Sequence, residues 1–595
     1  MPQIKNVCRY VWLFYIRLNH TKEKKIEQLM KSIGGGFLMK KLKMKRVVAL
    51  LLITMMIMGV MGCSKSESTD SGKVKDSTSI LTEPGTYPIV KEPIEMTIFC
   101  LAMPNVENFV TNDFTKFMEE KTGIKMKFET GSRDDWETKL NLSLSTNDYP
   151  DIIMYVNANR AKYGVKEGIL IQLDDYINEK NTPNYLAAMG QYLGATRETD
   201  GHFYSLAGLN ECYHCQYAKK MWVNTYWLEK MGVDVPTTTD EFYDVCKKFL
   251  EINPNGIAIG GANSGWHVRF EEFLVNSFTF EPGKTQSYRD ETAVTKDGKV
   301  ITIANTDGYK KALEYMNSLY ELGAIYDGNF TQNGEQLRTL ANQEGEPILF
   351  IPTGTISDMF DATGNNETYR HYQAMSPLAG PDGTRNATYM KYSGVEEGSF
   401  MITDKCKYPE AALRWADFFF TYQGSLSAQF GADEGKDWVM NPDGKVGLNG
   451  EPALYEILNP YSAETQNHDW QDVNIAYRPA DFRLGQATDA NVDVGTAEGL
   501  EKLLFDSTKE KMEPFAQTGD LDILPTLKLT DEESTKIQTI GVEVQNYIEE
   551  NKVAFITGSK SFEKDWDSYV KGFDNIGLPT LLEVYQAAYD RQMGK

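Results

Sequence analysis

The sequence predicts an α/β fold in which parallel strands are joined by crossover helices. Between residues 94 and 156, stretches with β-forming composition alternate with stretches whose apolar side chains recur at helical spacing. This alternation is typical of parallel sheets, because a parallel connection must be long enough to hold a helix. The length of 595 residues allows two or more domains, each large enough to bury a core.

The predicted elements follow one another closely. In chain order they are a strand at Ile94–Leu101, a helix at Asn112–Thr122, a strand at Ile124–Glu129, a helix at Asp135–Ser145 and a strand at Asp151–Val156. Gly123 is expected to end the first helix, and Tyr149-Pro150 separates the second helix from the third strand. Asn305 is expected to cap a later helix and Gly323 to end it. The clear later helices are Thr239–Ile252, Thr306–Leu322, Pro409–Phe420 and Leu578–Arg591.

Charge is distributed unevenly along the chain. Residues 1–62 contain 12 basic side chains and two acidic ones, whereas the rest of the chain carries a net charge of −33. A body this acidic repels phosphate backbones, so we expect no nucleic-acid partner. The acidity supports solubility and identifies no ligand.

A signal-like segment lies at residues 39–62. A basic stretch from Met39 precedes an apolar run of 15 residues, which is short for a membrane span, and Gly62 closes it. Val60-Met61-Gly62-Cys63 resembles the bacterial lipobox. The resemblance implies that Cys63 receives a lipid and that the chain is cleaved before it, anchoring the protein to the outer face of the cell membrane. An uncleaved membrane anchor is the alternative.

The residues on either side of this segment are not expected to belong to the folded domain. Gly34-Gly35-Gly36 precedes Met39 at a distance suited to a translated ribosome-binding site, so residues 1–38 are predicted to be translated upstream DNA. Residues 63–92 begin as a polar run with little to bury and are predicted to form a flexible tether. The folded body is expected to start near Pro93.

The motif search excludes several classes of active site. The chain contains no His-Glu-x-x-His pair, no Gly-x-Ser-x-Gly elbow and no complete phosphate loop, so we expect no cofactor, no metal and no enzyme activity. The adjacent carboxylates Glu396 and Glu397 could serve a glycosidase, but acidic pairs occur by chance in so acidic a chain. Seven cysteines are too few for a disulfide framework. Cys212-Tyr-His-Cys215 is interpreted as an ordinary loop, with a disulfide or half a metal site as alternatives.

Several segments together resemble the extracellular solute-binding proteins of family 1, in particular the long lipoprotein branch that includes alginate-oligosaccharide binders. The matching segments are residues 140–153, 201–206, 227–242, 399–403, 408–418, 555–558, 565–570 and 588–591. The most specific is Trp227-Leu-Glu-Lys-Met-Gly-Val-Asp-Val-Pro-Thr-Thr-Thr-Asp-Glu-Phe242. The match covers the body from about residue 93 to residue 595.

The resemblance implies a two-lobed fold of the periplasmic-binding-protein type II, with hinge strands joining the lobes. Lobe one would comprise residues 93–208 plus 385–430, and lobe two residues 209–380 plus 431–595. The chain would cross near Leu206–Asn210 and near residues 377–392. The implied function is capture of a small-molecule ligand, expected to be an oligosaccharide, by a monomer that delivers it to the permease subunits of an ABC importer. A lipid-anchored carbohydrate-active enzyme and a sensor ectodomain are the alternatives.

The chain departs from the family pattern where relatives often carry an acidic calcium loop. Only Asn253-Pro-Asn-Gly256 remains here, without the charged oxygen ligands that calcium requires. We therefore predict that no calcium binds at this position.

Candidate ligand contacts are aromatic faces for sugar CH groups and polar groups for hydroxyls, at strand ends or in loops. Trp266, in the glycine-flanked loop Gly261-Ala-Asn-Ser-Gly-Trp, is the best single candidate, whereas Trp227, Trp415 and Trp566 lie on apolar helical stripes and are expected in the core. The predicted contacts are Tyr155, Asn157, Asn210, Trp266, Glu397, Trp438 and Arg478.

Overall fold

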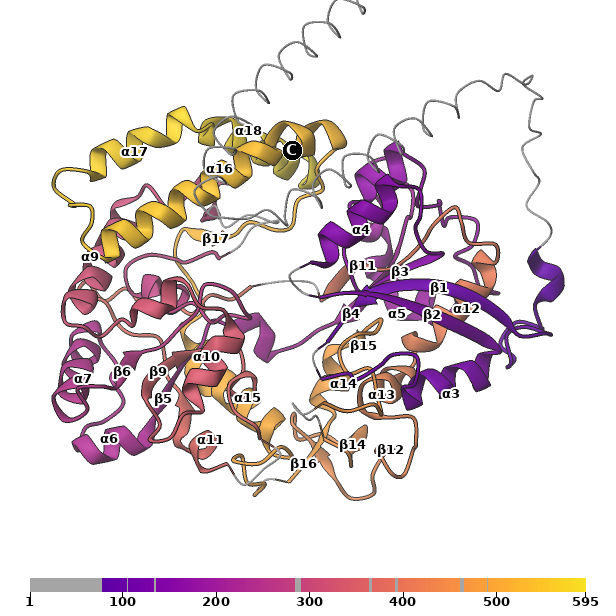
Figure 1. Cartoon of the computed structure of the whole chain (residues 1–595), viewed down its shortest axis with the longest axis horizontal. Helices are drawn as coiled ribbons and strands as arrows, with labels where there is room; N and C mark the ends of the chain where they lie inside the picture. Colours follow the sequence, from indigo (N-terminus) through magenta and orange to yellow (C-terminus); the bar gives the residue numbers. More distant parts are fainter. Residues whose placement is uncertain are drawn as a thin grey trace, which may run out of the picture. The chain divides into compact units, whose positions relative to one another are not determined.

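The described body has two lobes, and each is built around its own β-sheet (Figure 1). The computed structural model describes residues 77–595, apart from residues 104, 133–134, 284–290, 363–365, 391–393, 461–464 and 490. The predicted signal segment, the predicted start at Met39 and the predicted lipidation site Cys63 lie outside the described residues.

The first lobe contains a sheet of six strands among the described residues. In spatial order these are β15 (Tyr477–Arg478), β4 (Leu206–Asn210), β11 (Val395–Ile402), β3 (Ile152–Met154), β1 (Ile94–Leu101) and β2 (Ile124–Gly131). Strand β1 pairs in parallel with β2 and β3, as predicted, but β11 runs antiparallel to β3 and β4.

The second lobe contains a mixed sheet of four strands in the described part of the chain. In spatial order these are β10 (Tyr372–Ala374), β5 (Met221–Asn224), β9 (Ile348–Pro352) and β6 (Ile257–Ile259). A small sheet of β17 (Leu521–Ile523), β7 (Thr292–Thr295) and β8 (Val300–Thr302) accompanies it.

Two ribbons lie outside these sheets. They pair β12 (Trp438–Met440) with β14 (Tyr455–Ile457) and β13 (Val446–Gly447) with β16 (Ala487–Thr488). Trp438 and Tyr455 of the first ribbon pack with Leu426 and Phe482, which belong to helices of the first lobe.

The antiparallel strand in each main sheet is the one that follows a crossing between lobes. The chain leaves the first sheet after β4 and enters the second with β5, then leaves the second after β10 and re-enters the first with β11. A strand that arrives from the other lobe starts at the junction, whereas its neighbours end there, so it must run in the opposite direction. The parallel pairing predicted for residues 94–156 is therefore confirmed, whereas the returning strands β5 and β11 run antiparallel to their neighbours.

Helices cover the sheets in both lobes (Figure 1). In the first lobe they are α3 (Asp113–Thr122), α4 (Trp136–Ser145), α5 (Pro183–Met189), α12 (Pro409–Asp417), α13 (Tyr422–Phe430) and α14 (Ala480–Leu484). In the second lobe they are α6 (Thr225–Met231), α7 (Thr239–Ile252), α8 (Glu271–Leu274), α9 (Asp307–Glu321), α10 (Gly334–Ala341), α11 (Glu367–His371), α15 (Leu500–Ser507), α16 (Asp531–Ile556), α17 (Trp566–Asn575) and α18 (Leu578–Gln592).

Helix ends follow local sequence chemistry. Asn112 caps α3 by accepting from the backbone N–H of Phe114, and Gly123 ends the helix in the left-handed conformation. Helix α9 is capped by Thr306, whose side chain accepts from the backbone N–H of Tyr309, so the prediction of Asn305 as the cap was wrong. Asparagine and threonine side chains can both accept the backbone N–H at the start of a helix. With Asn305 and Thr306 adjacent, the sequence alone does not show which of them is the cap.

Two predicted boundaries differ from the structure. Trp470, Val473 and Ile475 belong to the hydrophobic core of the first lobe, and β15 pairs with β4, so part of the segment assigned to lobe two completes lobe one. The predicted tether also ends earlier than residue 92. Its C-terminal part contributes Leu81, Ile89 and Val90 to the same core, because these apolar residues follow the polar run.

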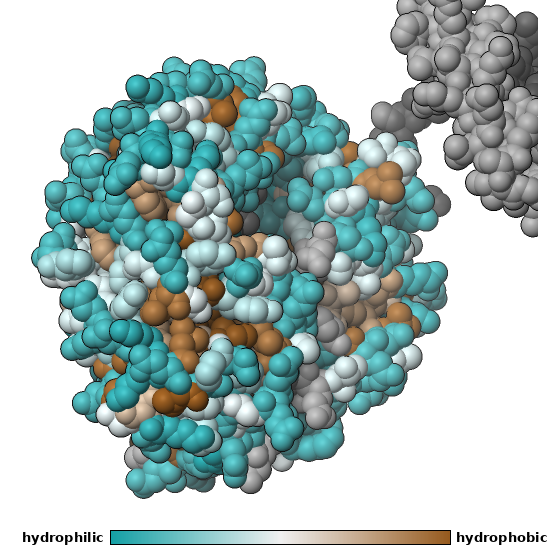
Figure 2. Space-filling view, turned by 60° about the vertical axis from the view of Figure 1, so that its left-hand side comes forward, coloured by the Kyte–Doolittle hydropathy of each residue, from teal (hydrophilic) through white to brown (hydrophobic). Residues whose placement is uncertain are grey.

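The face in Figure 2 is mostly hydrophilic, with hydrophobic residues gathered in its lower half. Among the described residues, no helix combines the length and apolar character needed to span a bilayer.

Candidate functional site

A large cleft lies where the two lobes meet. Its volume is about 2580 Å³, and its walls include loops and strand ends from both main sheets. Open α/β sheets bind ligands at the carboxyl ends of their strands. The carboxyl ends of β3 and β4 lie at this cleft, where Tyr155 and Asn210 line it. Six of the seven predicted contacts line this cleft: Tyr155, Asn157, Asn210, Trp266, Glu397 and Arg478.

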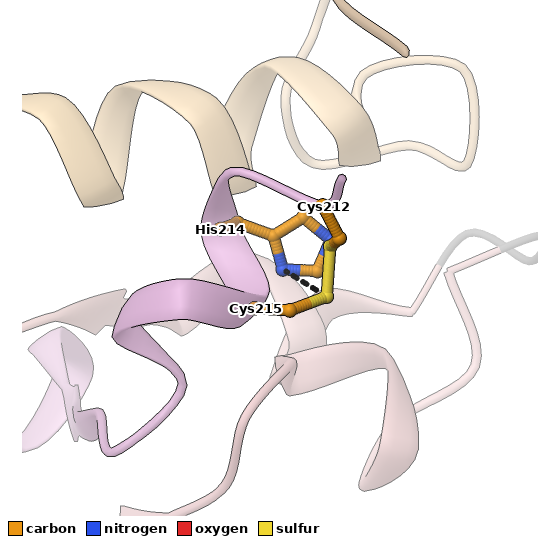
Figure 3. Close-up of side chains that lie close together, drawn as sticks. All are labelled: Cys212, His214 and Cys215. Carbon is orange, nitrogen blue, oxygen red and sulfur yellow. Dashed lines mark hydrogen bonds between the residues drawn. A yellow bond between two sulfur atoms is a disulfide. The ribbon is translucent and has the colours of Figure 1, made fainter. Parts of the chain in front are cut away.

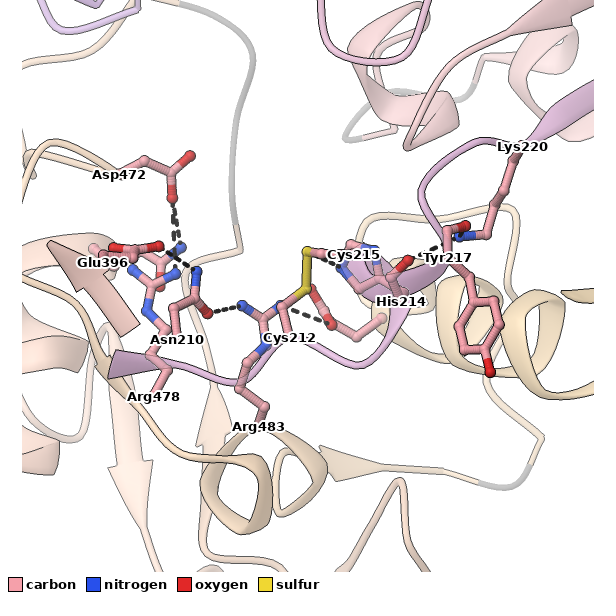
Figure 4. The surroundings of a disulfide bond; sticks show 12 residues. Asn210, Cys212, His214, Cys215, Tyr217, Lys220, Glu396, Asp472, Arg478 and Arg483 are labelled. Carbon is pink, nitrogen blue, oxygen red and sulfur yellow. Dashed lines mark hydrogen bonds and ion pairs between the residues drawn. A yellow bond between two sulfur atoms is a disulfide. The ribbon is translucent and has the colours of Figure 1, made fainter. Parts of the chain in front are cut away.

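Asn210, the last residue of β4, is held by side chains from two other segments. Its amide donates to Glu396 Oε1 over 3.2 Å, and its carbonyl oxygen accepts from Arg483 Nη1 over 3.1 Å (Figure 4). Arg478 lies nearby, with its guanidinium 3.8 Å from Asp472. The network fixes a row of polar groups along the floor of the cleft, at the point where the chain leaves the first lobe.

A second network holds Asn157 and Glu397. Arg160 lies 2.6 Å from Glu397 Oε2 and 2.5 Å from Glu198 Oε1, and it also donates to the side-chain oxygen of Asn157. Lys528, from the second lobe, approaches Glu397 to 3.4 Å. Both predicted contacts are therefore preorganised, because their side chains are fixed before a ligand arrives.

The adjacent carboxylates Glu396 and Glu397 are each engaged by other side chains. Glu396 is bonded to Asn210, and burial raises the pKa of its carboxyl. Glu397 is instead shared between Arg160 and Lys528. A glycosidase needs one carboxyl group as acid and one as nucleophile or base, each directed at the scissile bond. Both groups here are engaged in holding the walls of the cleft.

Trp266 provides an aromatic surface on the wall of the second lobe. The residue remains 38% exposed although its ring packs against the backbone of Gly354. A Cβ atom at Gly354 would lie 2.4 Å from the indole ring, so only glycine lets the ring lie there. His214 contacts the ring edge-on, with centroids 6.4 Å apart. An exposed ring on a rigid support suits stacking against a sugar face.

Tyr155 lies one residue beyond β3 in a left-handed backbone conformation, with φ of 57°. This conformation is uncommon for residues other than glycine and often marks a functional position. The backbone N–H of Tyr155 donates to the carbonyl of Ser399 on β11, over 3.0 Å. The strained residue is therefore held in place by the strand that returns from the other lobe.

Trp438 does not line the cleft. Its side chain is fully buried in a small cluster with Leu426, Tyr455 and Phe482. Its indole N–H donates to the carbonyl of Gly431 over 2.9 Å. The prediction was wrong because Trp438 lies on a short strand, and the local sequence does not show whether a side chain on such a strand faces the cleft or the core.

The crossing between β4 and β5 contains a disulfide between Cys212 and Cys215 (Figure 3). The preferred interpretation of this motif as an ordinary loop was therefore wrong. The donor atoms of Cys212, His214 and Cys215 lie within 4.8 Å of one another, but bonded sulfurs are not thiolate ligands for a metal. Burial lowers the pKa of His214 well below its ordinary value, so the imidazole is neutral.

Several lining residues were not among the predicted contacts. They include Tyr192, His214, Asp472 and Arg483. Tyr192 donates its hydroxyl to Glu211 over 2.9 Å, next to the crossing. The proximity of His214 to the predicted crossing at Asn210 was the available signal, whereas Asp472 and Arg483 are more than 250 residues away in sequence.

The comparison with protein families identifies the chain. Residues 104–426, more than half of its length, match the family described as bacterial extracellular solute-binding protein. The chain belongs to this family. The two lobes and the cleft between them agree with membership in a family of binding proteins.

Relatives of this solute-binding protein have been characterised. The fructooligosaccharide ABC transporter substrate-binding protein FusA of Streptococcus pneumoniae is 23% identical over 495 residues, covering 80% of this chain and 86% of FusA. Lipoprotein LipO of Bacillus subtilis is 23% identical over 359 residues, covering 59% of this chain and 65% of LipO.

Solved structures share the two-lobed fold. FusA in complex with kestose superposes with a TM-score of 0.70 at 21% identity, covering 84% of this chain and 100% of that one. The alginate-binding protein AlgQ2 without calcium superposes with a TM-score of 0.61 at 18% identity, covering 84% and 99%. The absence of a calcium site at Asn253–Gly256 stays a prediction.

Proposed function

We propose that this protein captures an oligosaccharide outside the cell and delivers it to the permease of an ABC importer. The observation that carries the proposal is the cleft, where the exposed face of Trp266 lies among fixed hydrogen-bonding groups such as Asn157 and Asn210. Family membership and the sugar-binding relatives support it. The protein acts as a monomer, and separate subunits supply the membrane channel and the ATPase.

Ligand-induced stabilisation tests this proposal. The purified protein is heated in the presence of individual oligosaccharides, and the melting temperature is recorded for each. A ligand that binds only the folded state at 100 times its Kd stabilises that state by about 2.7 kcal/mol, which raises the melting temperature. Chromatography of the same samples should show the glycan unchanged. No shift with any glycan, or cleavage of the one that binds, would count against a transport receptor.

The proposal includes a lipid anchor at Cys63. The lipobox-like Val60-Met61-Gly62-Cys63 supports it, together with the basic and apolar residues that precede it. In a bacterial host, the protein should incorporate a labelled fatty acid and sediment with membranes. Cys63→Ser should lose the label. Label retained in that variant would place the lipid elsewhere.

A further inference from the structure

The charges that line the cleft are predominantly negative. Among the described residues, eleven carboxylates line it, against six lysine and arginine side chains. Sugars without charge need only hydrogen-bond donors, acceptors and aromatic faces. A sugar that carries carboxylates also needs cations that are not already neutralised, because burying an uncompensated charge is costly.

Most of the lining cations already have carboxylate partners. Arg478 lies 3.8 Å from Asp472, and Arg483 lies 3.6 Å from Glu501 while it also donates to Asn210. The other ion pairs are Lys528 with Glu397, Lys445 with Glu456 and Lys219 with Glu281. Of the six, Arg338 alone has no ion pair within the described part of the chain.

The geometry of these pairs opposes an incoming carboxylate. Each partner carboxylate already compensates the charge of its cation, and a second anion would also experience repulsion from the first. Hydroxyl groups, by contrast, donate well to the same carboxylate oxygens. We infer that the cleft takes an uncharged oligosaccharide in preference to one that contains uronic acids. This inference rests on the proposed function and narrows its substrate class.

Family membership alone does not decide between these classes. The relatives include one named for fructooligosaccharides, which are uncharged, and one named for alginate, which is a polymer of uronic acids. The preference for uncharged over acidic ligands is therefore inferred from the ion pairs of this chain.

The experiment compares uncharged and acidic glycans on the same protein. Fructo-, malto-, xylo-, manno- and galacto-oligosaccharides form the uncharged set, and oligomers of alginate and galacturonate form the acidic set. The largest rise in melting temperature should come from the uncharged set. A larger rise with an acidic oligomer would overturn the inference but leave the proposed function standing. No rise with any glycan would remove both.

A matched pair then isolates the charge. The best uncharged ligand is compared by calorimetry with the same ligand after oxidation of primary hydroxyls to carboxylates. The oxidised form should bind at least tenfold more weakly.

Asp472→Asn, which frees Arg478 with little change in shape, should reduce this penalty severalfold. Asp520→Asn, at an exposed ion pair with Lys296 in which neither residue lines the cleft, should not. Equal or tighter binding of the oxidised ligand to the unmodified protein would contradict the inference.

Discussion

Exposure separates Trp266 from four tryptophans that are buried in the cores. Trp266 is 38% exposed on the cleft wall, whereas Trp222, Trp415, Trp438 and Trp470 are fully buried. Trp266 owes its position to two features of the chain, the small residues before it and the missing side chain at Gly354. A ring held in this way loses little freedom on binding, so most of its contact energy becomes available as affinity.

Replacing Trp266 with Ala should reduce affinity and leave stability nearly unchanged. Loss of one stacking face should cost about 1–3 kcal/mol, which is about tenfold to hundredfold in Kd. Calorimetry with the identified glycan measures the first effect, and thermal unfolding measures the second. Trp438→Ala is the matched control, and should lose about 3–5 kcal/mol of stability because it empties a packed site. Unchanged affinity in Trp266→Ala would show that the ring is only a packing residue.

Lys220 should make the stability of the protein rise with pH above neutral pH. Burial lowers its pKa from 10.5 to about 7, although its ammonium donates to the carbonyls of His214 and Tyr217. At a pH between these two pKa values, Lys220 is neutral in the folded protein and protonated in the unfolded chain. The unfolded chain then binds more protons, so this residue makes stability rise with pH across that range.

Urea unfolding of the unmodified protein and Lys220→Met at pH 7, 8 and 9 tests this prediction. The difference in stability between the two proteins should shift steadily in favour of the unmodified protein as pH rises. A difference that stays constant across the three values would mean that Lys220 keeps its ordinary pKa.

At the scale of elements, the segment between β4 and β5 joins the hinge to the cleft. Within a few residues it contains Asn210, the disulfide Cys212–Cys215 and the lining residue His214. The disulfide closes a loop of four residues, and cross-links of this length stabilise by about 2 kcal/mol in the chain-entropy description. It also restricts where the His214 ring, and the edge of Trp266 beside it, can lie.

Cys212→Ala/Cys215→Ala should therefore weaken ligand binding as well as stability. We expect a loss of about 2 kcal/mol in unfolding free energy and a severalfold rise in Kd, because two groups that line the cleft become less ordered. Treatment of the unmodified protein with dithiothreitol should reproduce both effects. The double variant itself should be insensitive to the reductant. Lower stability with unchanged affinity would limit the disulfide to a structural role.

Elements with a clear local signal could be predicted from sequence, and those that depend on distant partners could not. Strand β1 and helix α7 have the predicted bounds because strand composition or helical periodicity and capping all agree there. Helix α16 was not predicted as one element, although Thr530 caps it. Its buried residues recur at helical spacing, but Gly541, Asn551 and Lys552 are among them, so the buried stripe is not continuously apolar in the sequence.

The candidate site divides in the same way. Tyr155 could be found because it lies at the end of a predicted strand, and Asn210 because the family resemblance implied a crossing between lobes there. Arg483 could not, because only folding brings it within 3.1 Å of Asn210. Trp438 was misplaced because sequence composition does not show which side of a short strand faces solvent.

At the scale of the whole molecule, side chains near the start of α16 bridge the two lobes across one side of the cleft. Lys528 donates to the backbone carbonyls of Ala195 and Arg197, the latter over 2.6 Å, and lies 3.4 Å from Glu397. Lys166, on the first lobe, lies 2.6 Å from Asp531 at the first turn of α16. Contacts of this kind favour the closed arrangement before a ligand contributes any binding energy.

Removing the bridge should therefore shift the lobes toward an open arrangement. Lys528→Gln loses one charge, its ion pair with Glu397 and its bonds to two carbonyls, so the ligand-free protein should show a larger radius of gyration in X-ray scattering. Because the closed state would then be less populated, Kd should rise in proportion to that loss. With saturating ligand, both proteins should have the same radius. Lys536→Gln, which removes an exposed ion pair between α16 and α18 within one lobe, is the matched control and should change neither quantity. An unchanged radius and affinity in Lys528→Gln would mean that packing at the hinge alone sets the position of the lobes.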